Sequence, residues 1–239
     1  AATRRGDALI MSGVLERVPW ARIASRLVVL MHREDQALVA VVDPAHCAIE
    51  PGSNLAGEPR DRVRLDNVAA LLHAPAGAHV THEAFRLRSA LGRALLTAGA
   101  LERALELAVE YAKTRVQFGR RIGEFQAIQQ ELARAAGEVA AAVAASLSAA
   151  GAVDRGQHAS LAVAAARIRS AEAAREVALI AHQVHGAIGV TDEYALHHVT
   201  LRLWAWREEF GNEAAWAIEL GRAMQREGAA GFWPALSAE

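Results

Sequence analysis

The sequence contains a single cysteine, Cys47, and a single lysine, Lys113, among 239 residues. One cysteine excludes a disulfide framework or a thiolate zinc site within one chain, and it fits a reducing compartment. The two charge signs nearly balance, with 26 Lys and Arg against 27 Asp and Glu. The chain therefore has no broad basic field that would attract nucleic acid. Nearly all its cations are arginines, which suit bidentate contact with phosphate.

Long apolar segments are also lacking. The longest run without a charged residue or a histidine, residues 139–153, is rich in alanine and shorter than the ~20 residues that a membrane span needs. No charged segment leads into an apolar one at the start of the sequence, so no secretory signal is visible. A hydrophobic fraction of 53% is nevertheless ample for a core and excludes intrinsic disorder. We expect a folded, cytoplasmic protein with no membrane insertion and no nucleic-acid partner.

The pattern of the chain changes near residue 75. Before it, short segments rich in Val, Leu and Ile alternate with turn residues, and they cover residues 8–20, 26–32, 37–43 and 61–69. Segments of this length and composition predict antiparallel strands. Four or five strands are few for a self-contained sandwich or barrel, so we expect residues 1–75 to form part of a β domain.

Beyond residue 76 the apolar residues recur at spacings of three and four, which is typical of helices. Thr81 is a plausible N-cap of the first helix, and Thr191 or Asp192 could cap the fourth. The other helices are expected near residues 124–153, 158–184 and 212–227. The predicted class is α+β: a partial antiparallel β domain followed by an up-and-down, four-helix-bundle-type all-α domain over residues 76–239.

Several kinds of catalytic site have no motif here. No Gly-x-Gly-x-x-Gly follows a strand, and neither a Walker loop nor a Gly-x-Ser-x-Gly elbow occurs. A di-iron bundle needs paired Glu-x-x-His motifs, and no glutamate has a histidine three positions later. His182 and His185 alone are a weak metal signal, so we predict no metal site.

One candidate binding segment runs through residues 115–119 and continues at 125–126. An arginine there could clamp a phosphate, two phenylalanines offer flat apolar surface, and two glutamines offer donors and acceptors. An ordinary helix–helix corner capped by glycine explains the spacing at least as well. The candidate residues are Arg115, Gln117, Phe118, Phe125 and Gln126.

A second candidate segment covers residues 183–189, at the predicted end of a long helix. Gly186 and the small Ala187 would let a ligand approach the backbone closely, and Gln183 precedes them by one turn. A helix C-cap is again the alternative explanation.

Taken together, the two segments resemble the carboxy-terminal domain of the flavin-dependent acyl-CoA dehydrogenase family. The family pattern is Tyr-Ala-x-x-Arg-x-Gln-Phe-Gly, then Phe-Gln, and much later Gln-x-x-Gly-Gly-x-Gly. Residues 52–68 resemble the last strands of the family's middle β domain. The resemblance implies that the two segments hold the pyrophosphate and adenosine of FAD, usually the FAD of a neighbouring subunit. The matching positions are Tyr111, Ala112, Arg115, Gln117, Phe118, Gly119, Phe125, Gln126, Gln183, Gly186 and Gly189, with Ala187 in place of one glycine.

The resemblance also implies a reaction, the α,β-desaturation of an acyl-CoA thioester. A glutamate removes the α-proton while a hydride passes to FAD. The family keeps that glutamate either in a Tyr-Glu-Gly-Thr loop before the last helix or on the first helix of the bundle. Here those positions hold Gly211 and Ser89, so both are vacant. Glu209 and Glu213 flank the loop and are weak substitutes.

The vacant positions imply a partner role. In a homo- or hetero-oligomer, dimer or tetramer, another chain could supply the glutamate that acts on the acyl-CoA. The alternative is a non-catalytic structural subunit that binds no flavin. Trp204, Trp206 and Trp216 lie near the loop and could anchor a partner chain, although simple core packing explains them equally well.

Overall fold

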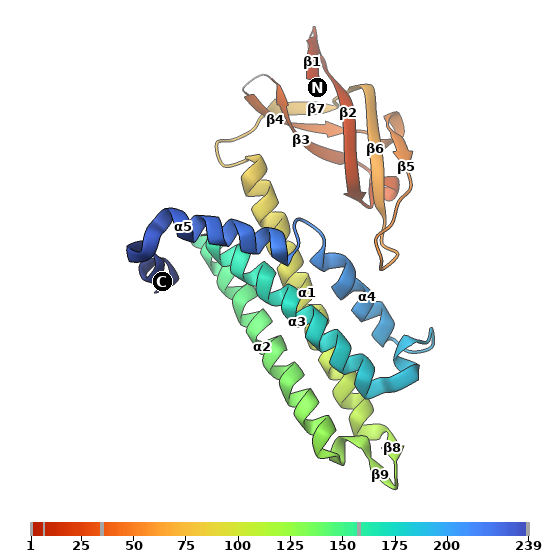
Figure 1. Cartoon of the computed structure of the whole chain (residues 1–239). Helices are drawn as coiled ribbons and strands as arrows, with labels where there is room; N and C mark the ends of the chain where they lie inside the picture. The colour runs from red at the N-terminus through yellow and green to blue at the C-terminus, as the bar shows by residue number, and fades with distance from the viewer. Residues whose placement is uncertain (1, 7, 34–35, 157–158, 238–239) are drawn as a thin grey trace. The chain divides into compact units, whose positions relative to one another are not determined.

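The computed structural model describes residues 2–6, 8–33, 36–156 and 159–237. The chain divides into two compact units, Ala1–Phe85 and Arg86–Glu239, which are described separately below. The sequence predicted a boundary at residue 75, where the last strand ends; the division between units falls slightly later, in the first turn of helix α1 (His82–Thr114). The predicted α+β class, with antiparallel sheets followed by helices, is confirmed (Figure 1).

Within its described residues the first unit contains seven strands in two antiparallel sheets, more than the four or five predicted. The three missed strands have only three or four residues each, too few to display an alternating pattern. One sheet has the order β1 (Ala2–Arg5), β2 (Ala8–Pro19), β6 (Arg60–Ala69), β5 (Ala48–Glu50). The other has the order β3 (Leu27–Arg33), β4 (Gln36–Val42), β7 (Leu72–Pro75).

Both sheets contribute to one hydrophobic core. Strand β4 alternates strictly, so that Leu38, Ala40 and Val42 are buried while the residues between them are not. Strand β6 buries Val63 and Leu65 by the same period of two. In the sequence these strands were recognised as short segments rich in Val, Leu and Ile between turn residues, and the structure adds which of their residues face the core.

A buried carboxylate joins the turns around the first sheet. The Asp61 side chain is fully buried and accepts hydrogen bonds from the backbone N–H and Nε of Arg22, each at 2.9 Å, and from the Gly52 N–H at 3.1 Å. The bond from the Arg22 side chain is the main cause that lowers the pKa of Asp61 to about 2, against the opposing effect of burial. The ionised carboxylate therefore stabilises the folded unit.

The second unit consists of long helices joined by short connections. The Thr81 hydroxyl caps α1 as predicted, because it accepts a hydrogen bond from the Ala84 N–H at 3.0 Å. The prediction that Thr191 or Asp192 caps the fourth helix is wrong: the Thr191 hydroxyl bonds back to Ile188, and the helix begins only at Leu196. The later helices are α2 (Gln126–Arg155), α3 (Ala159–His185), α4 (Leu196–Arg207) and α5 (Glu213–Ser237).

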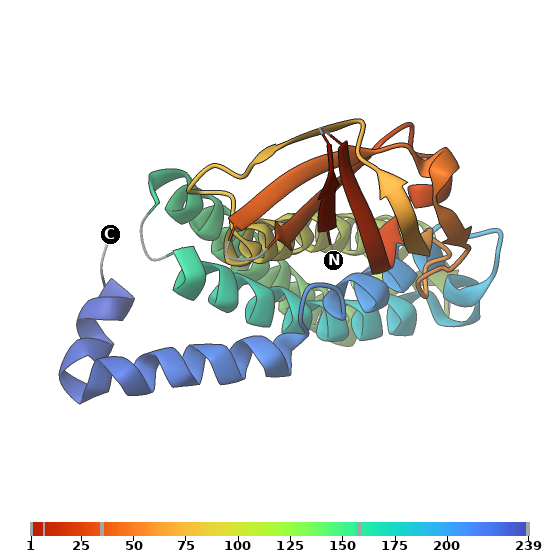
Figure 2. The same cartoon turned by 90° about the horizontal axis from the view of Figure 1, so that it is seen from above.

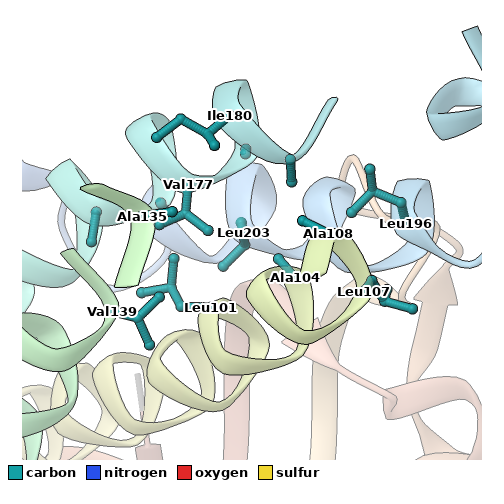
Figure 3. Close-up of a cluster of buried hydrophobic side chains, with 14 of the residues drawn as sticks. Leu101, Ala104, Leu107, Ala108, Ala135, Val139, Val177, Ile180, Leu196 and Leu203 are labelled. Carbon is teal, nitrogen blue, oxygen red and sulfur yellow. The ribbon is translucent and has the colours of Figure 1, made fainter. Parts of the chain in front are cut away.

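The core of the helical unit is built largely from alanine. Figure 3 shows Leu101 and Leu107 of α1 and Leu203 of α4 among small side chains such as Ala104 and Ala135. Small side chains let helix axes approach closely, and α2 packs along α3. Helix α5 is straight up to a break at Gly228, whose φ is 69°, and then turns sharply (Figure 2).

One described helix, α2, is long and apolar enough to cross a membrane by length and composition alone, with a mean hydropathy of 1.5. The core helix of a soluble protein passes the same test, so a single such helix is weak evidence for a membrane span. Its most apolar window is 28% buried within this chain.

Replacing Asp61 with alanine is expected to lower the free energy of unfolding by about 1.5–3 kcal/mol, because the hydrogen-bond donors of Arg22 and Gly52 lose a charged acceptor. The folded-state pKa is depressed, so this contribution is fully present above about pH 4 and lost as the pH falls towards 2. Urea unfolding at several pH values measures the effect. Asp66→Ala is the control, since Asp66 is an exposed carboxylate on the same strand; equal losses in both variants would contradict the assignment.

Candidate functional site

The segment after α1 forms a short β-hairpin. Strand β8 (Val116–Gln117) pairs with β9 (Arg120–Arg121), leaving Phe118 and Gly119 as a two-residue loop. Their φ angles are 53° and 78°, the positive values that a type I′ turn requires at both positions. The alternative of a helix–helix corner with a capping glycine is therefore wrong, because Gly119 lies at the tip of a hairpin.

The hairpin presents an aromatic side chain to solvent. Phe118 is 90% exposed, and its ring meets Phe125 edge to face with centroids 6.3 Å apart. The Arg120 guanidinium lies over the Phe125 ring, 4.0 Å from its centroid. A left-handed backbone is uncommon for phenylalanine, and such conformations cluster at functional sites. Exposure and strain together mark this tip as a candidate binding surface.

The C-terminal end of α3 faces the hairpin. The helix ends at His185, Gly186 follows with a φ of 63°, and a 3₁₀ turn covers Gly186–Val190. His185 is 4% exposed and stacks on Tyr111 of α1 with ring centroids 4.6 Å apart. Burial lowers the pKa of His185, so its imidazole is neutral at physiological pH. This aromatic contact joins the ends of α1 and α3.

Between the two segments lies a cavity of about 550 Å³, within the range typical of ligand pockets. Of the eight candidate binding residues only Gln126 does not line it, and Gly119 and Gly189 of the family pattern do not line it either. Sequence reasoning did not assign the remaining lining residues to the site, although Tyr111 belongs to the family pattern and Val184 and His185 lie within the second candidate segment. The predicted lining residues are Arg115, Gln117, Phe118, Phe125, Gln183, Gly186 and Ala187; the others are Tyr111, Ile122, Ala127, Ile128, Val184 and His185.

The cavity has the chemistry that part of a dinucleotide requires. Arg115 is exposed and, within the described residues, forms no ion pair with a carboxylate, so its guanidinium is available for phosphate. Phe125 offers a flat apolar face, and Gln183 is an exposed amide. A Cβ built on Gly186 would meet no atom within 4 Å, so the backbone there is open to a ligand. Among the described residues, no group of three or more His, Cys, Asp or Glu side chains could hold a metal.

The α4–α5 turn, residues 208–212, contains the sequence position that the family resemblance connects with the base. Gly211 has a φ of 96°, and a Cβ built there would lie 2.8 Å from Nε1 of Trp216. That indole is 1% exposed and donates to the Phe210 carbonyl at 3.1 Å. Ser89, at the other base position, is half-buried on α1. Neither position carries a carboxylate.

The two substitute carboxylates are engaged in ion pairs. Glu209 is 5% exposed, and its Oε2 lies 2.6 Å from Nε of Arg93. Glu213 pairs with Arg207. Burial raises the pKa of Glu213, but hydrogen bonds from its own N–H and from Arg207 outweigh burial and leave the pKa below its usual value. Both groups therefore serve the structure of the turn.

The tryptophans near this turn belong to the chain's own core. Trp216 and Trp206 are buried within the helical unit, and Trp204 packs partly against its main hydrophobic cluster. Core packing, one of the two explanations considered for them, accounts for these side chains.

Comparison with known proteins places the chain in a family. Over residues 76–225, more than half of its length, it matches the family described as Acyl-CoA dehydrogenase, C-terminal domain. It is 42% identical to the acyl-CoA dehydrogenase IpdE2 of Mycobacterium tuberculosis over 99 residues, which are 41% of this chain and 30% of that protein. It is 33% identical to the acyl-CoA dehydrogenase FadE27 of the same organism over 144 residues, 57% of this chain and 39% of that protein.

A solved structure agrees with these relatives. The ChsE4-ChsE5 complex from Mycobacterium tuberculosis matches with a TM-score of 0.84 and 26% identity, over 95% of this chain and 63% of that chain. The chain thus spans less than two thirds of the length of each relative described here. Members of the family are flavoproteins, typically with FAD, and the family suggests oxidoreductases acting on CH–CH bonds. The match over residues 76–225 and the two relatives confirm the resemblance, and this chain belongs to the acyl-CoA dehydrogenase family.

Proposed function

We propose that the chain is a subunit of an acyl-CoA dehydrogenase-type flavoprotein that contributes to an FAD site and lacks its own catalytic base. The observation that carries the proposal is that the hairpin after α1 and the end of α3 line the same cavity. Two segments far apart in the sequence, each of which matches the family's flavin-contacting pattern, line the same space.

The chain's residues suggest how each part of the cofactor would be held. Arg115 would make charge-assisted contacts with the pyrophosphate, and Phe118 and Phe125 would pack against the adenine. The Gln117 and Gln183 amides would hydrogen-bond polar atoms at the rim, where Gly186 and Ala187 leave the backbone accessible. Bound FAD would supply the hydride acceptor for α,β-desaturation of an acyl-CoA thioester.

A cofactor shared between chains fits the exposure of these groups. An aromatic ring that is 90% exposed at a strained hairpin tip is stabilised when a ligand or partner covers it. The ChsE4-ChsE5 structure is, by its title, a complex of two proteins. We accordingly propose that this chain works in a dimer or tetramer, homo- or hetero-oligomeric, with its cavity directed towards a neighbour's flavin.

The missing carboxylate supports the proposal that this chain contributes to the FAD site while another chain supplies the catalytic base. Removing the α-proton of a thioester needs a placed base, and Gly211 and Ser89 offer none. Glu209 and Glu213 are engaged with Arg93 and Arg207. The glutamate would come from another chain of the assembly.

The alternative is a structural subunit that binds no flavin, which the vacant base positions also favour. The visible absorption spectrum of the purified protein, alone and after co-expression with its natural partner, separates the two functions. Bound flavin supports the first function, and its absence from both preparations supports the second.

Arg115→Ala is expected to weaken FAD retention roughly tenfold or more, because one charge-assisted phosphate contact is worth about 1.5–3 kcal/mol. Flavin titration of the wild type and of Arg115→Ala, each in the assembly that binds flavin, measures the change in FAD affinity. Lys113→Ala is the matched control: an exposed cation two residues away that does not line the cavity. Equal affinities for Arg115→Ala and the wild type would remove the phosphate assignment.

Anaerobic mixing of the flavin-loaded chain with a panel of acyl-CoA thioesters is expected to bleach the flavin slowly. Losing general-base catalysis typically costs a factor of roughly 10² to 10⁴. Glu209→Gln and Glu213→Gln should bleach at the wild-type rate, with circular dichroism to verify their folding. Fast bleaching that one of these variants abolishes would identify that residue as the base and end the proposal of a base-lacking subunit.

Introducing a side chain at Gly211 is expected to destabilise the chain rather than restore a base. Gly211→Ala should lower the free energy of unfolding by about 1–3 kcal/mol, because φ is positive and the new Cβ would collide with the Trp216 indole. Gly137→Ala is the control, since Gly137 lies inside α2 with open space around it and should gain about 0.5–1 kcal/mol. Urea unfolding that shows a more stable Gly211→Ala variant would contradict this geometry.

A further inference from the structure

Four backbone carbonyls converge on a single side-chain nitrogen at the other end of the helical unit. Nη2 of Arg167, on α3, lies 3.2 Å from the carbonyl oxygen of Trp206, 3.0 Å from that of Arg207, 3.0 Å from that of Glu209 and 2.8 Å from that of Gly211. Arg167 is 1% exposed. A fully buried guanidinium is therefore directed at the backbone of the α4–α5 turn, although acidic side chains are close by.

The end of a helix explains why a cation suits this position. The last carbonyls of a helix have no partner within it and carry the negative end of its dipole. Here those carbonyls are at the end of α4, and the chain reverses there into α5. Burial is the main cause that lowers the pKa of Arg167 to about 10, and the nearby Arg93 adds to it, while Glu209, Glu213 and Glu208 oppose it. At neutral pH the guanidinium remains charged and donates hydrogen bonds to the last carbonyls of α4, which have no acceptor role inside the helix.

The conformation of the turn needs such support. Phe210 has a φ of 57° and Gly211 a φ of 96°, so two consecutive residues adopt left-handed backbone. Strained backbone persists only where its surroundings determine it. Arg167 bonds the carbonyls on both sides of Phe210, and the Trp216 indole bonds the carbonyl of Phe210 itself. Two buried side chains thus satisfy the backbone acceptors of the strained segment.

We infer that Arg167 is a positioning residue that holds the α4–α5 turn in one backbone conformation and thereby fixes the place where the family carries a catalytic carboxylate. The link between this turn and catalysis rests on the proposed function. The statement that Arg167 holds the turn in one conformation does not depend on it. In this chain the turn keeps one backbone conformation and carries no carboxylate at the family's base position. The carboxylates of Glu209 and Glu213 are held by their ion pairs with Arg93 and Arg207.

Amide hydrogen exchange of the full chain tests the inference. Arg167→Met keeps the length and apolar stem but removes the donors, and we expect exchange in residues 208–216, including the Trp216 indole N–H, to accelerate by about tenfold or more. Arg167→Lys retains a buried cation with a shorter reach and should recover part of the protection. Arg175→Met is the control, because Arg175 is an exposed arginine on the same helix.

The outcomes separate positioning from general stability. Acceleration confined to the turn, with partial recovery by lysine, supports the inference. Unchanged exchange in the turn, or equal acceleration in every helix, overturns it. If Arg167→Met does not fold, the comparison of Arg167→Lys with Trp216→Phe decides: the inference requires faster exchange of the turn in both.

Flavin content is measured in the same preparations. Arg167 and Gln183 are sixteen residues apart on α3, roughly 24 Å at 1.5 Å per residue, so flavin retention should not change in the Arg167 variants. Wild-type protein that never binds flavin would contradict the proposed function while leaving the exchange result intact. The two proposals therefore fail separately.

Discussion

The candidate site depends on the alternating direction of the first three helices. Because α1 and α3 run the same way and α2 returns between them, the C-terminal ends of α1 and α3 lie at the same end of the helical unit (Figure 1). The stack of Tyr111 on His185 then closes the space between those ends. A glycine follows His185, and a tight hairpin follows α1, so backbone and exposed side chains border the cavity. Without this helix order, the two motifs would not meet.

Much of this arrangement could be predicted from the sequence, for physical reasons. The apolar spacing of the long helices is regular, so the positions of α2 and α3 were correct to within a few residues. Helix α5 begins where it was predicted, but it continues beyond the break at Gly228 to Ser237, past its predicted end at residue 227. The hairpin was missed because its strands have two residues each and its loop is Phe-Gly. The usual type I′ loops begin with Asn, Asp or Gly, which tolerate positive φ more readily than phenylalanine. The late start of α4 was missed because Thr191 bonds within its own 3₁₀ turn.

The turn between α4 and α5 could not be predicted in this way. A pattern of residues can indicate a buried carboxylate–arginine pair, since both partners are side chains. Arg167 instead contacts carbonyl oxygens, which every residue carries and no sequence reveals. The same holds for Glu209: its position beside Gly211 made it a candidate base, and only its 2.6 Å distance from Arg93 shows another role. Sequence located the turn correctly but could not tell a reactive carboxylate from a structural one.

The two ends of α3 thus have opposite physical characters. At its C-terminal end Gln183 is exposed, as are Arg115 and Phe118 of the neighbouring hairpin segment, and the hairpin tip is strained. Such a surface gains stability when another molecule covers it. Near Arg167 five consecutive or near-consecutive backbone carbonyls of the turn already accept hydrogen bonds from buried side chains of the chain itself, so an added ligand would find few free backbone acceptors there. Under the proposed function, cofactor contacts would come from the C-terminal end of α3, while the α4–α5 turn would keep one backbone conformation and supply no base.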